Sequence, residues 1–179
     1  MIDTDLKKKI RRIVDFPEKG IVFWDIAPLL EDKKALKYLV GRLVFKYKNK
    51  KIDKVVGIDA RGFILAGILA ERLGAGIVMV RKQGKLPCQV ESADIDIEYG
   101  KRTLEIQKNS IFPGDRVLLI DDVLATGGTM EAVANLVKKL KGKIVAIAFL
   151  IVLDYFPGRD KLKNYRLDSL INYKDRNGN

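Results

Sequence analysis

Two adjacent carboxylates stand at the end of an apolar run in the second half of the chain. Residues 117–120 are continuously apolar, and Asp121 and Asp122 follow directly. Such a run is typical of a central parallel strand that is covered on both faces. Ligands of open α/β sheets bind at the carboxyl ends of the strands, where carboxylates can accept hydrogen bonds from sugar hydroxyls. The pair therefore predicts a place for a polyhydroxylated ligand.

A loop of small residues comes next. Its members are Ala125, Thr126, Gly127, Gly128 and Thr129. Apolar residues at helical spacing follow between positions 130 and 140, so we expect the loop to open a helix that Gly142 ends. Free N–H groups and the positive dipole end of a helix bind phosphate, and glycines allow its close approach. The loop therefore predicts a cradle for a sugar phosphate, with an ordinary strand-to-helix turn as the alternative.

Periodicity predicts the elements that would position these residues. Helical spacing covers 32–47 and 62–73, the second helix ending near Gly74, and strand patterns cover 54–59, 76–80 and 144–153. This order predicts a doubly wound, mainly parallel α/β sheet with right-handed crossovers, and a hairpin-like excursion between 81 and 107. Apolar residues between 167 and 171 suggest a final strand or turn, and the polar end 174–179 is expected to be frayed.

Composition limits the class of protein. The chain has 179 residues, a formal net charge of +11 and one cysteine, Cys88, and we find no linker or internal repeat, so a single domain over 1–179 is expected. The apolar run 144–153 is too short to cross a bilayer, and the first residues lack a secretion signal. The basic charge can attract anionic ligands, but we interpret most of it as solvated surface. We expect a cytoplasmic protein without nucleic-acid or membrane partners.

Two further groups of residues suit anion binding. Asp59, Ala60 and Arg61 stand at the end of a predicted strand and precede a predicted helix, which offers a second anion site or forms a plain turn. Arg81, Lys82 and Lys85 follow the next strand. They either supply positive charge to an anionic leaving group or form a basic surface cluster.

These motifs carry a family resemblance. Residues 117–129 resemble the signature with which type I phosphoribosyltransferases bind 5-phosphoribosyl 1-pyrophosphate (PRPP), and residues 15–30, 57–63, 81–87 and 98–106 resemble the adenine phosphoribosyltransferase family in order and spacing. The resemblance spans about 15–153 and implies purine salvage, in which PRPP and adenine give AMP and pyrophosphate. The alternatives are an enzyme that uses hypoxanthine, guanine or xanthine, and a PRPP-sensing regulator.

The resemblance also implies roles for the residues. Residues 125–129 would hold the 5′-phosphate, and Asp121 and Asp122 would bind the ribose and act in catalysis. Pyrophosphate would contact Asp59, Ala60, Arg61, Arg81, Lys82 and Lys85. Adenine would contact Val22, Trp24 and Arg61. Mg²⁺ is expected as cofactor, held mainly by substrate and water without dedicated protein ligands.

The remaining expectations concern a hood, a lid and a partner. The resemblance implies a small N-terminal hood over about 1–30, a flexible lid over 81–107 and a homodimer. Glu98 in the lid can exchange a proton with the purine, or it can belong to an ordinary alternating strand. Trp24 stands where the family usually has arginine, and its indole can stack on a purine or fill the hood. Lid residues Cys88, Asp94, Ile95 and Asp96 also depart from the family and bear on lid closure.

Overall fold

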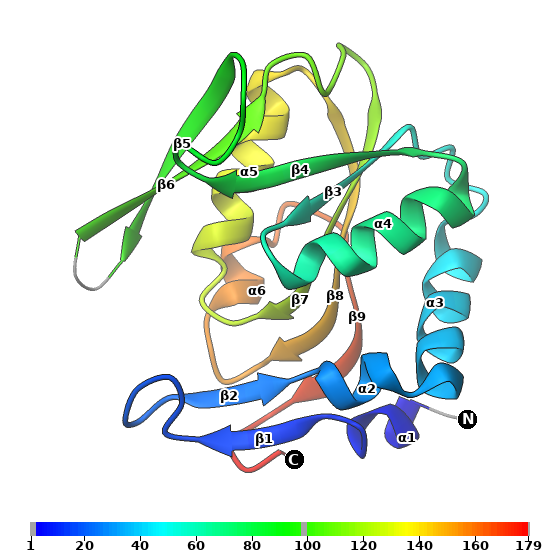
Figure 1. The fold of residues 1–179 in the computed structure, drawn as a ribbon, viewed down its shortest axis with the longest axis vertical. Coiled ribbons are helices and arrows are strands. Elements are labelled where there is room, and N and C mark those ends of the chain that lie inside the picture. The colour runs from blue at the N-terminus through cyan, green and yellow to red at the C-terminus, as the bar shows by residue number, and fades with distance from the viewer. Residues whose placement is uncertain (1–2, 98–99, 179) are drawn as a thin grey trace.

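The computed structural model describes residues 3–97 and 100–178, and it is built around one large sheet (Figure 1). The helices are α1 (Asp3–Lys7), α2 (Ala27–Glu31), α3 (Lys33–Tyr47), α4 (Arg61–Leu73), α5 (Gly128–Lys139) and α6 (Gly158–Lys161). The strands are β1 (Arg11–Val14), β2 (Val22–Asp25), β3 (Lys54–Ile58), β4 (Gly76–Lys82), β5 (Val90–Ile97), β6 (Gly100–Gln107), β7 (Arg116–Leu124), β8 (Lys143–Leu153) and β9 (Leu167–Tyr173).

The large sheet is mainly parallel. Within the described residues its strand order is β5-β6-β4-β3-β7-β8-β9. The neighbours from β4 through β3, β7 and β8 to β9 are parallel, whereas β6 is antiparallel to both β4 and β5. The predicted doubly wound sheet with a hairpin excursion is therefore confirmed, and the hairpin β5–β6 projects from one side of the molecule (Figure 1).

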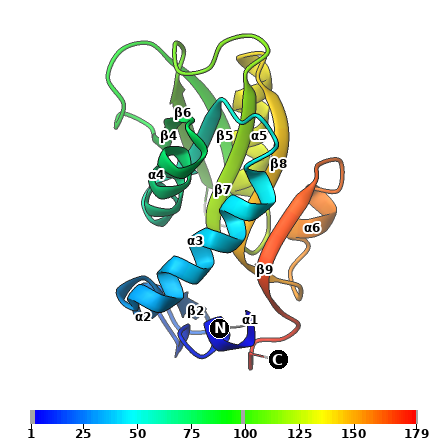
Figure 2. The ribbon, with the colours of Figure 1, turned by 90° about the vertical axis from the view of Figure 1, so that its right-hand side faces the viewer.

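Helices cover both faces of the sheet (Figure 2). Alternation along β7 explains why: Leu118 and Ile120 pack in the cluster with α3 and α4, while Val117 and Leu119 pack in the cluster with α5. A strand buried on both faces must be apolar throughout, as the sequence from 117 to 120 is. None of the helices in residues 3–97 and 100–178 is long and apolar enough to cross a membrane.

The hood is a small antiparallel pair, β1–β2, flanked by α1 and α2. Trp24 of β2 stacks on Tyr173 of β9, with ring centres 3.9 Å apart. The end of the chain then returns to the hood, where Arg12 Nε donates to the Arg176 carbonyl oxygen at 2.6 Å. The polar end that the sequence suggested would be frayed therefore contacts the hood as far as residue 178.

Two predicted boundaries change near the loop 125–129. Strand β7 continues through Asp121 and Asp122 to Leu124, because its pairing with β8 extends that far. Helix α5 ends at Lys139, and the left-handed residue after it is Lys141 (φ 63°), not Gly142. Gly142 is needed for packing instead, since a Cβ there would lie 2.8 Å from Val137 Cγ1.

Candidate active site

The two predicted loops meet at one edge of the sheet. Strands β3 and β7 are parallel neighbours, so the loop after β3 and the acids of β7 lie side by side. Glycine at position 62 makes this approach possible. A Cβ on Gly62 would lie 2.7 Å from Asp121 Oδ1 and 3.3 Å from the Ile120 carbonyl oxygen. Helix α4 therefore begins in direct contact with the acidic end of β7.

A cavity of about 250 Å³ opens at this contact. Seven of the predicted site residues line it: Asp59, Ala60, Arg61, Lys82, Asp121, Asp122 and Thr129. The hairpin adds Ile95, Arg102 and Leu104. The cavity thus combines carboxylates with basic side chains, which suits a ligand with both hydroxyl and anionic groups.

The loop 125–129 forms a second hollow of about 130 Å³. Ala125, Thr126, Gly127 and Thr129 line it, and it shares Asp121, Val123 and Thr129 with the larger cavity. Gly127 is the N-cap of α5 and adopts φ 82°, a left-handed conformation that favours glycine. Gly128 is the first residue of the twelve-residue helix α5. The two hollows therefore adjoin. The N-terminus of α5 borders the smaller hollow, and Asp121 lines both.

The carboxyl groups of Asp121 and Asp122 both have raised pKa values. Burial, and then the charge of Asp122, raise the pKa of Asp121 well above its ordinary value. Burial also raises the pKa of Asp122, although the Arg61 guanidinium opposes this. Arg61 Nε lies 2.7 Å from Asp122 Oδ2, but no donor in the described residues makes a hydrogen bond to this buried oxygen. The ion pair with Arg61 therefore compensates the charge of this buried oxygen.

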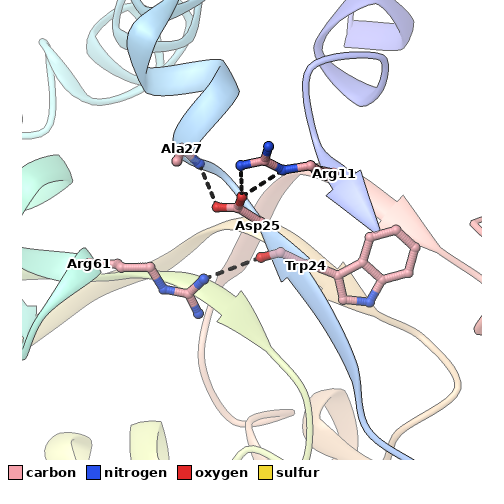
Figure 3. Close-up of polar contacts among 5 residues, drawn as sticks. All are labelled: Arg11, Trp24, Asp25, Ala27 and Arg61. Atoms are coloured by element: carbon pink, nitrogen blue, oxygen red, sulfur yellow. Dashed lines mark hydrogen bonds and ion pairs between the residues drawn. The ribbon is translucent and has the colours of Figure 1, made fainter. Parts of the chain in front are cut away.

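Arg61 also joins the site to the hood (Figure 3). Its Nη1 donates to the Trp24 carbonyl oxygen at 3.2 Å, and its guanidinium lies 4.7 Å from the Phe23 ring centre. The Trp24 indole points away from Arg61 (Figure 3). It is 4 % exposed, and its Nε1 donates to the Tyr155 hydroxyl at 3.2 Å. Of the two possibilities for this indole, the structure therefore shows hood packing, with the Trp24 main chain turned toward Arg61.

The sequence and the fold are similar to those of known proteins. A family model for the phosphoribosyl transferase domain matches residues 29–175. Adenine phosphoribosyltransferases of Geobacter metallireducens and Trichlorobacter lovleyi are 52% and 48% identical over 169 residues, which are 94% of this chain and 99% of each relative. The chain belongs to the adenine phosphoribosyltransferase family. A crystal structure of the Thermoanaerobacter pseudethanolicus member has a TM-score of 0.92 and 45% identity, covering 96% of this chain and 99% of that one.

Membership of the adenine phosphoribosyltransferase family confirms the resemblance that the motifs indicated. The other predicted residues are placed as follows. Arg81 Nε pairs with Asp59 Oδ2 at 2.8 Å, and its Nη1 donates to the Lys85 carbonyl oxygen at 3.1 Å. Neither Arg81 nor Lys85 is among the residues that line the cavity. Val22 is half-buried in β2, and Glu98 lies outside the described residues.

Arg102 also lines the cavity, although it lies outside the site motifs of this adenine phosphoribosyltransferase family member. The alternation of residues along β6 could have indicated its position. Arg102 precedes Leu104 and Ile106 by steps of two, so all three share one face of β6, and the two apolar residues are buried. Alternation along β6 therefore places Arg102 on the same face as Leu104, which also lines the cavity.

Proposed function

We propose that the protein catalyses purine salvage by transferring the 5-phosphoribosyl group of PRPP to N9 of adenine, giving AMP and pyrophosphate. The observation that carries this proposal is that the two hollows adjoin at Asp121, Val123 and Thr129. A pentose phosphate can span the two hollows, with its phosphate in the smaller one and its ring hydroxyls at the acids of the larger one. The names of the close, equally long relatives favour adenine over a 6-oxopurine as acceptor, and an enzyme over a regulator.

The ribose phosphate is held from two sides. The N–H groups at the start of α5 and the hydroxyls of Thr126 and Thr129 bind the 5′-phosphate. Asp121 and Asp122 accept hydrogen bonds from the ribose hydroxyls, since both carboxylates line the larger cavity. With both ends fixed, the anomeric carbon can move from pyrophosphate to the base while the carboxylates stabilise positive charge that develops on the sugar.

Adenine binds beneath the hood. Main-chain groups of Val22 and Trp24 read its hydrogen-bonding edge, so replacement of the family's usual arginine by Trp24 leaves selection intact. Arg61 borders the base, since its guanidinium already lies between Asp122 and the Trp24 carbonyl. A purine with a 6-oxo group reverses the polarity of that edge and is rejected. Glu98 exchanges a proton with the purine ring when the lid closes.

The leaving pyrophosphate faces the loop at Asp59, Ala60 and Arg61, with Lys82 and Arg102 as neighbouring cations. Arg81 holds Asp59 in position and fixes the loop at Lys85. The described residues contain no group of three or more His, Cys, Asp or Glu side chains that could hold a metal. Two adjacent carboxylates at the cavity nevertheless fit Mg²⁺ held mainly by substrate and water. When bound, Mg²⁺ neutralises charge on the pyrophosphate.

We also propose a homodimer in the cytoplasm. Ile64 of α4 and Ile77 and Met79 of β4 are exposed apolar residues on the elements next to the Arg81 segment. Their burial between two copies would bring the basic residues at 81–85 toward the neighbouring site. The single, exposed Cys88 suits a reducing compartment.

The proposed acceptor can be tested by pyrophosphate release. Purified protein with PRPP and Mg²⁺ is offered adenine, hypoxanthine, guanine or xanthine separately, with the Asp121→Asn/Asp122→Asn double variant as control. We expect release with adenine alone, abolished in the double variant. Release only with a 6-oxopurine would refute adenine as the acceptor, and binding of PRPP without release for any base would refute the enzyme.

A further inference from the structure

Helix α6 is packed against the phosphate loop through glycine. A Cβ on Gly127 would lie 3.0 Å from both Cα and O of Gly158, and a Cβ on Gly158 would collide with the Ala125 carbonyl oxygen. The next residue after α6, Leu162, is fully buried in the core under α5. Backbone contact on one side and a buried anchor on the other fix the position of α6 relative to the loop.

This packing carries a lysine to the phosphate loop. Lys161 stands three residues after Gly158, so the two residues lie on the same side of α6. Its Nζ lies 3.9 Å from the position that a Cβ on Gly128 would occupy. Gly128 begins α5, and its neighbours Gly127 and Thr129 line the 5′-phosphate hollow. The free N–H groups and the positive dipole end of α5 are therefore close to that hollow. The ammonium therefore lies within a few ångströms of the proposed phosphate-binding groups.

The charge arrangement around Lys161 is unfavourable without an anion. A cation beside a helix N-terminus is repelled by the helix dipole. Among residues 3–97 and 100–178, no carboxylate forms an ion pair with Lys161, whereas Arg159 on the same helix pairs with Asp154. An anion between Lys161 and the start of α5 would be attracted to both and would relieve the repulsion.

We propose that Lys161 is a ligand of the 5′-phosphate, pairing its ammonium with the phosphate monoester of PRPP and of AMP. This inference rests on the proposed function and adds a residue outside the signature segment 117–129. The 5′-phosphate does not change during transfer, so Lys161 stabilises substrate, transition state and product alike. Its loss should raise the KM for PRPP and weaken AMP binding, with kcat nearly unchanged.

The test compares Lys161→Met and Lys161→Arg with Lys163→Met, a control that removes an exposed charge two residues away. Calorimetric titrations of AMP, ribose 5-phosphate and adenine are made with each purified protein. Lys161→Met should weaken AMP and ribose 5-phosphate about 10- to 100-fold, as loss of a charge-assisted hydrogen bond implies. Adenine affinity should stay within about twofold, and Lys161→Arg should retain most of the phosphate affinity.

Equal weakening by Lys163→Met would overturn the inference, because general surface charge would then explain the effect. Unchanged AMP and ribose 5-phosphate binding in Lys161→Met would overturn it as well, and would leave the proposed function standing if the wild type binds both. If the wild type binds neither phosphate compound, the proposed function fails and the inference fails with it. Thermal melts without ligand check folding: Lys161→Arg should match the wild type, and Lys161→Met should melt at the same temperature or slightly higher, since Lys161 is exposed and its loss relieves the repulsion from the helix dipole.

Discussion

Arg61 Nε lies 2.7 Å from Asp122 Oδ2, a buried oxygen to which no donor in the described residues makes a hydrogen bond. This contact joins the loop after β3 to the acidic end of β7. The same guanidinium donates to the Trp24 carbonyl oxygen of the hood. One side chain thus connects the regions that we assign to pyrophosphate, ribose and base.

Asp122→Asn should impair catalysis. The change removes a negative charge beside Arg61 and one acceptor for the ribose hydroxyls. We expect kcat/KM for PRPP to fall about 10²- to 10³-fold, the usual cost of losing a preorganised electrostatic partner. Steady-state kinetics would measure this, with Asp160→Asn as a control that neutralises an exposed carboxylate on α6. Wild-type kinetics in Asp122→Asn would refute the assigned role.

Gly62→Ala should disturb the site without disturbing the helix. A Cβ at this position would lie 2.7 Å from Asp121 Oδ1, so the carboxylate must move. We expect kcat/KM to fall about tenfold or more, since small displacements of positioned groups are costly. Gly67→Ala in the same helix is the matched control, because its Cβ would meet only Ile77 Cδ1, at 3.8 Å. It should gain about 0.5–1 kcal/mol of stability with activity retained.

Asp121→Asn should stabilise the unliganded protein at neutral pH. The pKa of Asp121 is raised in the folded state by burial and by the charge of Asp122. Between the unfolded pKa, about 3.9, and the raised folded pKa, the folded state binds more protons than the unfolded state. The free energy of unfolding of the wild type therefore falls as pH rises through this window. The Asp121→Asn variant has no carboxyl group at this position to ionise, so it does not lose this stability.

Thermal melts across pH check this linkage. We expect the Asp121→Asn variant to have a higher free energy of unfolding and a higher Tm than the wild type near pH 7. The difference should shrink as pH approaches 4. A gap that stays constant over this range would mean that ionisation of Asp121 is not its cause.

Trp24 should matter for stability and not for base choice. Its indole is buried against Tyr173 and turned away from Arg61 (Figure 3). Trp24→Ala should cost about 3–5 kcal/mol in unfolding free energy. Trp24→Phe should cost about 1 kcal/mol for the lost hydrogen bond to Tyr155, while the kcat/KM ratio of adenine to hypoxanthine stays unchanged. Phe45→Ala, at an exposed aromatic, is the control. A changed base ratio in Trp24→Phe would contradict this arrangement.

The spacing of apolar residues and glycines in the sequence was sufficient to predict the elements whose structure depends mainly on neighbouring residues. The apolar run before Asp121, the small-residue loop after it and the helical spacing beyond predicted a strand, a loop and α5. The positive φ at Gly74 was also predictable, because a helix commonly ends in a left-handed glycine. The continuation of β7 to Leu124 was not, since it depends on pairing with β8.

Contacts between distant segments could not be predicted from one sequence. Trp24 is buried because β9 brings Tyr173 beneath it, about 150 positions later in the chain. Arg81 carries the charge expected of a pyrophosphate ligand, but Asp59 pairs with it. Lys161 approaches the phosphate loop only because Gly158 lets two backbones touch. In each case the sequence showed the type of residue, but the residue that it contacts depended on how the chain folds.

The most direct test of the central claim is the stoichiometry of the reaction. Purified protein is incubated with PRPP, adenine and Mg²⁺, and AMP and pyrophosphate are quantified over time by chromatography, beside the Asp121→Asn/Asp122→Asn variant. We predict one AMP for each pyrophosphate and no turnover by the variant. Pyrophosphate without AMP, or equal AMP formation by the variant, would contradict the transfer of ribose phosphate to adenine at this site.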